Sequence, residues 1–288
     1  MGEVEEFIRD NLTVRTILIS DELEAEYAAD VMRIWADGDD CGLNVQVIMS
    51  LTGIYLPDCV LISSDEELLV AAKNRSMATI GVTLPGREED GLTCDILSIG
   101  MEGVDIEFID RIVKRNEGVP WNVLITERTI LREISLDDLG RIFEIYDAPG
   151  ITDYMENLFD REEEEEYIRK YIDTIYRFYG YGMWVVCDKD THEIIGRAGF
   201  SHGAGDSDAS LELGYIIAKE MQMQGIASEV IAALIDYARQ NLYDFATLSC
   251  FIHPDNVISI HLAEKFDFVL MGAVEVKGHE VLHYQLEL

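Results

Sequence analysis

The sequence predicts an α/β protein of two domains, the first of which is built on a parallel sheet. Its 288 residues equal about two average domains, and 48% of them are hydrophobic, which is ample for a core in each. Up to residue 117, short β-branched stretches alternate with stretches of helical periodicity, as in a parallel sheet with helices on its faces. The segment Gly118-Val119-Pro120-Trp121 breaks this pattern, because Pro120 forces an extended residue before it. We therefore expect domains at residues 1–120 and 121–288.

The elements of the first domain follow from these two periodicities. Strands are expected at residues 16–19, 45–49, 59–62, 78–82 and 95–97, and helices at residues 23–36, 65–74 and 105–114.

Residues 59–82 resemble the C-terminal half of haloacid-dehalogenase-like domains, through Val60-Leu61-Ile62-Ser63-Ser64-Asp65, Ala71-Ala72-Lys73 and Thr79-Ile80-Gly81-Val82. Where that family carries its metal-binding Asp residues, this sequence has Ser64 and Leu68, and no D-x-D-x-T nucleophile motif comes earlier. Without clustered carboxylates, Mg²⁺ binding and phosphoryl transfer of that kind are not expected. The resemblance therefore implies a non-catalytic domain for recognition or dimerisation. An unrelated small α/β domain is the alternative.

The second domain begins with an alternating strand and a capped helix. Residues 128–134 alternate as a strand does, and Ser135 can cap a helix whose apolar face begins at Leu139. The acidic run at residues 162–166 is interpreted as the first turn and solvated face of another helix rather than as a metal site. Further strands are expected at residues 183–187, 194–200, 211–218, 246–252, 269–276 and 281–288.

The strongest local signal is the junction between the strand at residues 211–218 and a helix that starts near Ala227. Beyond Ala227 the apolar residues recur with a period of 3.6 residues, as in an amphipathic helix. The loop at residues 222–227 therefore lies at a helix N-terminus, where free N–H groups and the macrodipole favour an anion. Gly225 and Ala227 are small enough for a phosphate to approach the backbone. An ordinary tight connection is the alternative for this loop taken alone.

Two motifs lie around this junction, and the first is Gln222-x-x-Gly225-x-Ala227. It resembles the Q/R-x-x-G-x-G/A coenzyme A signature of the GCN5-related N-acetyltransferase (GNAT) family. Residues 252–268 are similar to the N-x-x-S-x-x-x-x-E-K-x-G-F segment of the branch that acetylates N-terminal amines of ribosomal proteins. The resemblance covers roughly residues 122 to 288. It implies a mixed, mostly antiparallel sheet whose central strands splay apart, and acetyl-CoA as the co-substrate.

The same resemblance assigns the coenzyme A contacts. The exposed backbone of Tyr215, Ile216 and Ile217 is implied to pair with the thioester, with the Ile216 N–H polarising its carbonyl. The pyrophosphate is implied to bind the loop that consists of Gln222, Met223, Gln224, Gly225, Ile226, Ala227 and Ser228. The remaining contacts are implied for Asn256, on the pantetheine arm, and for Ser259 or Lys265, on the adenosine side.

Glu212 is the candidate general base, because a carboxylate at this position takes the amine proton through water in related enzymes. A salt bridge or a plain surface role is the alternative. The family's Tyr acid lies seven residues after the motif Asn, and this sequence has Ala263 there. The proton for the thiolate is therefore expected from solvent or from Cys250, Ser249 or Ser259.

Aromatic residues on the neighbouring strands are candidates for the acceptor pocket. In the family these strands pair with the strand at residues 211–218, so Tyr181, Trp184 and Phe200 are expected either to line the pocket or to pack in the core. His202 is the histidine to test as a base, because it begins a Gly-rich loop on the expected acceptor side. Neither the six histidines nor the five cysteines, which form no C-x-x-C pair, indicate a metal site.

The net charge of −34 restricts the partners. Such a charge repels nucleic-acid phosphates and anionic lipid surfaces, so no nucleic acid and no membrane is expected as a partner. No apolar run approaches the ~18 residues of a membrane span and the N-terminus is acidic, which predicts a cytoplasmic protein. The charge favours a cationic acceptor such as a protein N-terminus, a polyamine or an aminoglycoside-like amine, although solubility explains it equally well. A homodimer is left open.

The sequence thus predicts an enzyme that transfers an acyl group, acetyl by preference, from acetyl-CoA to a primary amine. A non-catalytic sensor that binds acyl-CoA is the alternative, which the absence of the Tyr acid permits.

Overall fold

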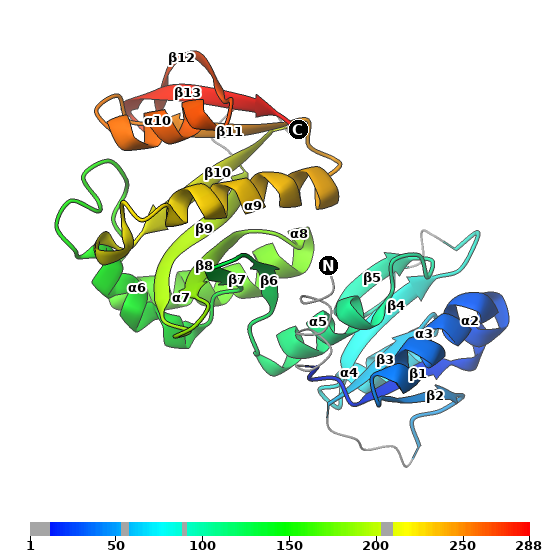
Figure 1. The fold of residues 1–288 in the computed structure, drawn as a ribbon. Helices are drawn as coiled ribbons and strands as arrows, with labels where there is room; N and C mark the ends of the chain where they lie inside the picture. The colour runs from blue at the N-terminus through cyan, green and yellow to red at the C-terminus, as the bar shows by residue number, and fades with distance from the viewer. Residues whose placement is uncertain (1–11, 53–57, 88–90, 203–209) are drawn as a thin grey trace. The chain divides into compact units, whose positions relative to one another are not determined.

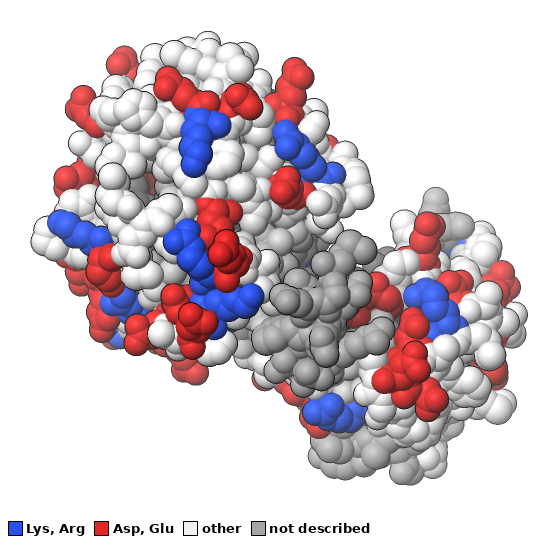
Figure 2. Space-filling view, in the orientation of Figure 1, with Lys and Arg blue, Asp and Glu red and all other residues white. Residues whose placement is uncertain are grey.

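The computed structural model describes residues 12–52, 58–87, 91–202 and 210–288. The chain forms two compact units, Met1–Trp121 and Asn122–Leu288. Each unit contains a sheet of its own (Figure 1). Acidic side chains outnumber basic ones on the visible surface of both units (Figure 2), as the charge of −34 requires.

The first unit contains a parallel sheet in the order β2-β1-β3-β4-β5. Its elements are β1 (Thr16–Ser20), α2 (Asp21–Glu26), α3 (Ala28–Asp40), β2 (Asn44–Ile48), β3 (Cys59–Ser63), α4 (Glu66–Lys73), β4 (Ala78–Thr83), β5 (Ile96–Ile99) and α5 (Ile106–Glu117). β1, β3 and β4 are buried along their whole length, because apolar clusters cover both faces of the sheet. The predicted α/β fold with a parallel sheet is thereby confirmed.

The helix expected at residues 23–36 is in fact two helices. Tyr27 leaves the helical conformation, with φ −119° and ψ 42°, and separates α2 from α3. Its hydroxyl donates a hydrogen bond to the carbonyl of Thr83 at the end of β4, 3.1 Å away. This break depends on a contact between distant segments, so the local periodicity could not indicate it.

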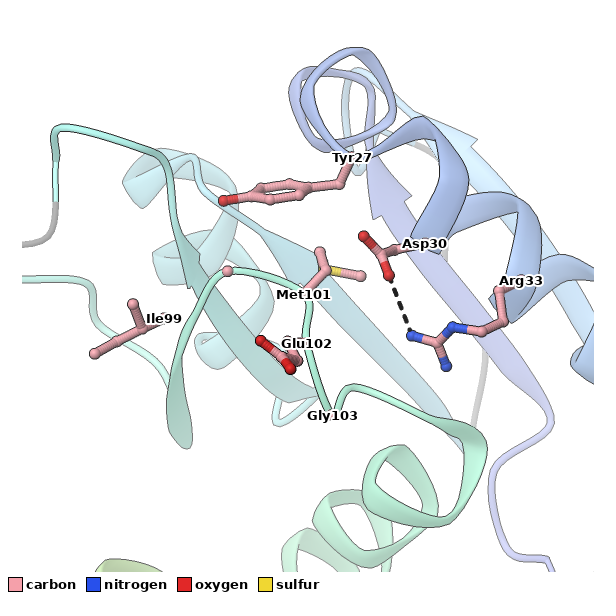
Figure 3. A pocket seen from close by; sticks show the side chains of 8 residues that line it. Tyr27, Asp30, Arg33, Ile99, Met101, Glu102 and Gly103 are labelled. Atoms are coloured by element: carbon pink, nitrogen blue, oxygen red, sulfur yellow. Dashed lines mark hydrogen bonds and ion pairs between the residues drawn. The ribbon is translucent and has the colours of Figure 1, made fainter.

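A pocket of about 550 Å³ opens beside Tyr27, at the carboxyl end of β5 (Figure 3). Its lining consists of Tyr27, Asp30, Arg33, Ile99, Gly100, Met101, Glu102 and Gly103. The Arg33 guanidinium donates to Asp30 Oδ1 at 3.4 Å and to the carbonyl of Val104 at 3.3 Å. The pocket thus combines an internally paired Asp and Arg with one further carboxylate, Glu102, and differs from the clustered carboxylates that phosphoryl transfer requires.

The second unit contains a mixed, mostly antiparallel sheet in the order β12-β13-β11-β10-β9-β8-β7-β6. Its strands are β6 (Asn122–Ile125), β7 (Thr129–Arg132), β8 (Met183–Asp188), β9 (Ile194–His202), β10 (Ser210–Ile217), β11 (Thr247–Ile252), β12 (Val269–Val276) and β13 (His279–Glu287). β10 and β11 are parallel, and their pairing ends at Glu212 and Ser249. β10 nevertheless stays paired with β9 as far as Ile217. The central strands therefore diverge beyond Glu212, which confirms the predicted splayed sheet.

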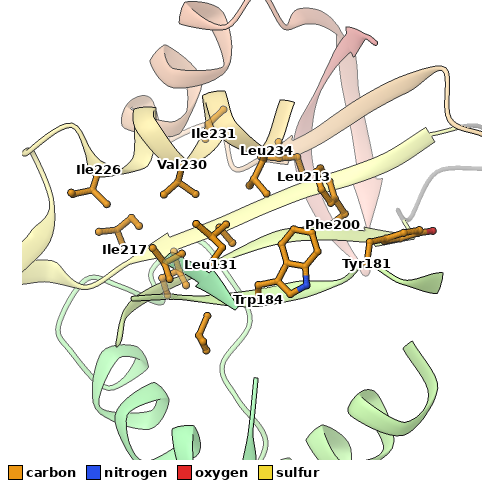
Figure 4. Packing of buried hydrophobic residues seen from close by; sticks show 14 of the residues in the cluster. Leu131, Tyr181, Trp184, Phe200, Leu213, Ile217, Ile226, Val230, Ile231 and Leu234 are labelled. Carbon is orange, nitrogen blue, oxygen red and sulfur yellow. The ribbon is translucent and has the colours of Figure 1, made fainter. Parts of the chain in front are cut away.

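The helices of the second unit lie on the two faces of this sheet. They are α6 (Leu139–Tyr146), α7 (Arg161–Tyr171), α8 (Arg177–Tyr179), α9 (Ile226–Asn241) and α10 (Val257–Lys265), with short 3-10 or π turns at Leu136–Asp138, Ile172–Tyr176 and Lys219–Met221. α9 packs on one face, and α6 and α7 lie on the other side of the strands (Figures 1 and 4). We name these the α9 face and the α7 face.

Candidate active site

The loop between β10 and α9 turns through two left-handed residues. Met223 and Gly225 have φ values of 59° and 84°, and Gly225 immediately precedes the first turn of α9. Within 4 Å, a Cβ added at Gly225 would meet the guanidinium of Arg128 alone, 3.6 Å away. The first N–H groups of α9 have no partner one turn back in the helix. This geometry leaves room for an anion against the backbone at the positive end of the helix.

Arg128, which directly precedes β7, and Glu229, in the first turn of α9, fix this loop in place. Arg128 Nε lies 2.7 Å from Glu229 Oε2, its backbone N–H donates to Oε1 at 2.8 Å, and Nη1 donates to the carbonyl of Gln224 at 3.0 Å. Burial raises the pKa of Glu229, but hydrogen bonds from Thr126 and Arg128 outweigh it and lower that pKa below its ordinary value. No local sequence pattern indicates this clamp, because its two halves lie 101 residues apart.

The two glutamines of the loop are used within the protein. Gln222 Nε2 donates to the carbonyl of Ile217 at 3.0 Å, and Gln224 Nε2 donates to the carbonyl of Glu220 at 2.9 Å. The amides therefore shape the loop, and the surface left for a ligand is the backbone around Gly225.

Residues of α10 meet this junction from a third direction. Lys265 Nζ donates to Ser228 Oγ at 3.0 Å, so a cation stands beside the first turn of α9. The hydroxyl of Tyr215 on β10 donates to Ser259 Oγ at 3.0 Å. Asn256 caps α10, because its side-chain oxygen accepts from the N–H of Ser259 at 3.2 Å. The structure thus brings the predicted residues of β10, α9 and α10 together around one junction.

Where β10 and β11 part, side chains replace the missing backbone hydrogen bonds. The thiol of Cys250 donates to the carbonyl of Leu213 at 3.6 Å. Burial raises the pKa of this thiol, with a smaller contribution from the charge of Glu212, so the thiol stays protonated. On the other face of β11, Ser249 Oγ lies 3.0 Å from His283 Nε2. The gap is therefore bordered by neutral proton donors.

Glu212 lies at the last paired position, on the α7 face. It alternates along β10 with Leu211 and Leu213, which are buried in the core of this unit. The segment at residues 147–160 between α6 and α7 borders the same face. The contacts that hold this segment include a stack of Tyr154 on His253 with centroids 5.1 Å apart and an ion pair of Glu156 with Lys277 at 2.8 Å.

The aromatic candidates for the acceptor pocket lie on the α9 face. Trp184 and Phe200 are 0% exposed and pack edge to face beneath α9 (Figure 4). Tyr181 is 4% exposed, and its hydroxyl lies 2.9 Å from His202 Nε2. His202 pairs with Leu211, so it shares the face of Leu211 and not that of Glu212. These side chains therefore form core and core rim, while the rest of the Gly-rich loop, residues 203–209, lies outside the described residues.

Comparison with known proteins places this geometry in a family. The profile of the Acetyltransferase (GNAT) domain matches residues 128–269. The uncharacterized N-acetyltransferase YoaA of Bacillus subtilis is 30% identical over 154 residues, which cover 53% of this chain and 85% of YoaA. The chain belongs to the GNAT acetyltransferase family. The uncharacterized protein YkkB of the same organism is 29% identical over 143 residues, which cover 49% of this chain and 82% of YkkB.

Solved structures similar to the GNAT domain include further acetyltransferases. An acetyltransferase from Agrobacterium tumefaciens is 25% identical to this chain, with a TM-score of 0.48. The match covers 57% of this chain and 92% of the Agrobacterium chain. Another acetyltransferase, from Salmonella typhimurium, is described as modifying the N-terminal serine of ribosomal protein L7/L12. It is 20% identical with a TM-score of 0.48, and the match covers 58% of this chain and 99% of the Salmonella chain.

Membership makes the protein an N-acetyltransferase, and members of this family use acetyl-CoA. The residues present fit such a co-substrate, because the backbone at Gly225 is open and Lys265 stands beside it. Ala263, where the family has its Tyr acid, is 6% exposed and has no proton to give.

The described residues show neither a metal cluster nor a membrane helix. No group of three or more His, Cys, Asp or Glu among them is arranged to hold a metal ion. His279 and His283 are four residues apart, but they lie on strand β13, where this spacing spans about 13 Å rather than one helical turn. No helix in the described ranges is both long and apolar enough to cross a bilayer.

Proposed function

We propose that the protein transfers an acetyl group from acetyl-CoA to a primary amine on the α7 face of the GNAT domain. The observation that carries this proposal is the end of the β10–β11 pairing at Glu212, on the strand that leads into the open Gly225 loop. A gap between two central strands exposes backbone N–H and C=O groups that a ligand can pair with.

The chain contributes binding and orientation at two places. The amides of the first turn of α9, with Lys265 beside them, would hold the pyrophosphate of coenzyme A. Acetyl-CoA supplies the acyl group as a reactive thioester. The N–H groups of Tyr215 and Ile217 face the gap, because the pairing with β9 directs the N–H of Ile216 toward the carbonyl of Arg197 instead. These two groups would align the thioester, and one of them, rather than the N–H of Ile216, would polarise its carbonyl.

Protons move at the edge of the same gap. Glu212 would accept the proton of the amine through water, since its carboxylate lies at the last paired position of β10. The leaving thiolate would take a proton from solvent or from the neutral donors Cys250, Ser249 and Ser259. The candidate acceptors are a protein N-terminus, a polyamine and an aminoglycoside-like amine.

The experiment is a calorimetric titration of acetyl-CoA into wild type and Gly225→Glu, followed by thiol release against these acceptors. A carboxylate at residue 225 would oppose the pyrophosphate, so we expect acetyl-CoA to bind about 100-fold more weakly. Gly42→Glu is the matched control, because Gly42 is also left-handed (φ 71°) with open space around it but lies in the first unit. Equal loss in both variants would contradict a site at the loop.

The rival function is an acyl-CoA sensor, which the buried methyl of Ala263 favours. A sensor would bind acetyl-CoA with the same dependence on Gly225 but release no thiol with any acceptor. Thiol release with one acceptor class decides for the transferase and names its substrate.

We infer that the first unit is a recognition or dimerisation module. Ser64, at a position where haloacid-dehalogenase-like domains have Asp, donates to Glu22 at 3.1 Å, and the carboxylate of Asp65 caps α4. Hydrolysis of a generic phosphate ester with added Mg²⁺ would overturn this assignment.

A further inference from the structure

A buried guanidinium on the α7 face lacks an anionic partner. Arg197 on β9 is 7% exposed, and its Nε has no hydrogen-bond partner. The acceptor within reach is the hydroxyl of Tyr146, 3.5 Å from Nη1, which is the limit of a hydrogen bond. No carboxylate of the residues that the structure describes forms an ion pair with it. A buried cation is costly unless it is paired, so this site requires an explanation.

A second arginine of the same domain is neutralised in the usual way, by an ion pair with a carboxylate. Arg132 on β7 is partly buried, and its two terminal nitrogens each lie 2.7 Å from an oxygen of Asp138. That bidentate pair satisfies the planar guanidinium within the protein. Arg197 is more deeply buried and has no such pair.

The surroundings keep Arg197 charged. Burial lowers its pKa, but the hydroxyls of Tyr146, Tyr176 and Tyr171 and the carboxylate of Glu164 outweigh burial and hold the pKa above its ordinary value. Glu164 is itself engaged, since Oε2 accepts from the N–H of Phe159 at 3.2 Å. Arg197 is therefore a cation, and the nearby Glu164 carboxylate is bound to the Phe159 N–H rather than paired with it.

Strand register places Arg197 at the reaction site. Arg197 is the antiparallel partner of Ile216, which lies between Tyr215 and Ile217, the two residues whose N–H groups face the gap, and paired residues project from the same face. Glu212 projects from that face as well, four residues earlier on β10, about 13 Å along the strand. The side chains of a glutamate and an arginine span much of this distance. Base and guanidinium therefore lie on one face, at the two ends of the stretch where β10 has left β11.

We propose that the acceptor carries a carboxylate beside its amine, and that Arg197 binds this carboxylate while the amine faces the thioester. This inference rests on the proposed transfer of an acetyl group to a primary amine, and it puts a free amino acid in place of the three acceptor classes named there. The amine nitrogen forms a bond to the acyl carbon as the carbon–sulfur bond breaks. One proton passes from the amine through water to Glu212, and the thiolate takes one from solvent, which leaves an N-acetyl amino acid and free coenzyme A.

The test compares common amino acids with their α-carboxamides as acceptors for the full-length wild type, measured as kcat/KM from thiol release. An amino acid and its α-carboxamide differ in the carboxylate alone. For at least one amino acid, the kcat/KM of the wild type is therefore expected to exceed that of its amide by about tenfold or more. In Arg197→Gln, the rate with that acid should fall about 100-fold while the rate with its amide changes about threefold or less. Equal use of amides, or a preference for spermidine, an aminoglycoside or a peptide N-terminus, overturns the inference.

Two further measurements distinguish the loss of the carboxylate site from misfolding of the variant and from failure of the proposed function. Arg132→Gln breaks an internal pair, so it should lower the melting temperature and affect acid and amide alike, whereas Arg197→Gln should not lower the melting temperature. Calorimetric binding of the amino acids without acetyl-CoA tests the carboxylate site directly, and absence of binding by every acid overturns the inference. Failure of acetyl-CoA itself to bind would instead overturn the proposed function.

Discussion

The two sheets of this protein differ in how completely they close. In sheet β2-β1-β3-β4-β5 the central strand β3 is paired with β1 over residues 59–62 and with β4 over residues 60–63, and both faces are covered by apolar clusters. In the GNAT sheet the central pair β10–β11 separates after Glu212, although each strand keeps its other neighbour. The first sheet therefore satisfies its backbone internally, and the second leaves a stretch of its centre for a ligand.

This difference indicates which part of the protein can bind a ligand and react with it. Polar groups that the protein itself does not satisfy concentrate at the gap and on its α7 face, around Gly225, residues 215–217 and Arg197. The first unit shows a pocket whose arginine is already paired. Three variants test this contrast, in order of expected effect.

Glu212→Gln should have the largest effect. Loss of a general base costs about 10²–10⁴-fold in kcat, while acetyl-CoA binding should change little because the Gly225 loop is intact. Thiol release gives kcat, and calorimetry gives the dissociation constant. The matched control is Glu275→Gln on β12, an exposed carboxylate of the same domain. A variant that keeps most of its activity would make Glu212 a surface or salt-bridge residue.

Leu61→Ala should damage the first unit without touching the chemistry. Leu61 is fully buried in β3, and truncation should lower the free energy of unfolding of that unit by about 2–5 kcal/mol. Differential scanning calorimetry measures this loss, and thiol release below the transition measures activity. If kcat also falls while the protein is still folded, the first unit takes part in acetyl transfer. The two sheets would then not differ in function as proposed.

Glu229→Gln should have the smallest effect. It removes the ion pair with Arg128 and weakens the support of the Gly225 loop, so the free energy of unfolding should fall by about 1–3 kcal/mol and acetyl-CoA should bind more weakly. The pKa of Glu229 is lowered in the folded protein. Its contribution is therefore complete above the unfolded pKa of about 4.3 and is lost as the pH falls through the lower folded value.

Thermal melts of wild type and Glu229→Gln between neutral and acid pH measure this dependence. The difference in melting temperature should narrow as the pH falls below about 4. A difference that stays constant would mean that the Glu229 carboxylate does not support the loop through its charge.

Local features of the sequence predicted most of the elements but not all of their limits. The strands β1, β3, β4 and β8 follow apolar β-branched runs and were predicted within one residue at each end. The four-residue strand β6, directly after Trp121, was not predicted, because so short an edge strand has no periodicity of its own. The break at Tyr27 was also missed, since the hydrogen bond to Thr83 spans 56 residues.

The sequence alone determined the α/β class, the position of the Gly225 loop before α9 and the family, because these depend on periodicity, glycine and short motifs, which act within a few residues. The tertiary structure alone decided that Arg128 clamps the loop through Glu229 and that Trp184 and Phe200 belong to the core. It alone revealed that Arg197 is buried without an anion. Burial and pairing depend on which distant segments meet, and no pattern along the chain encodes the absence of a partner.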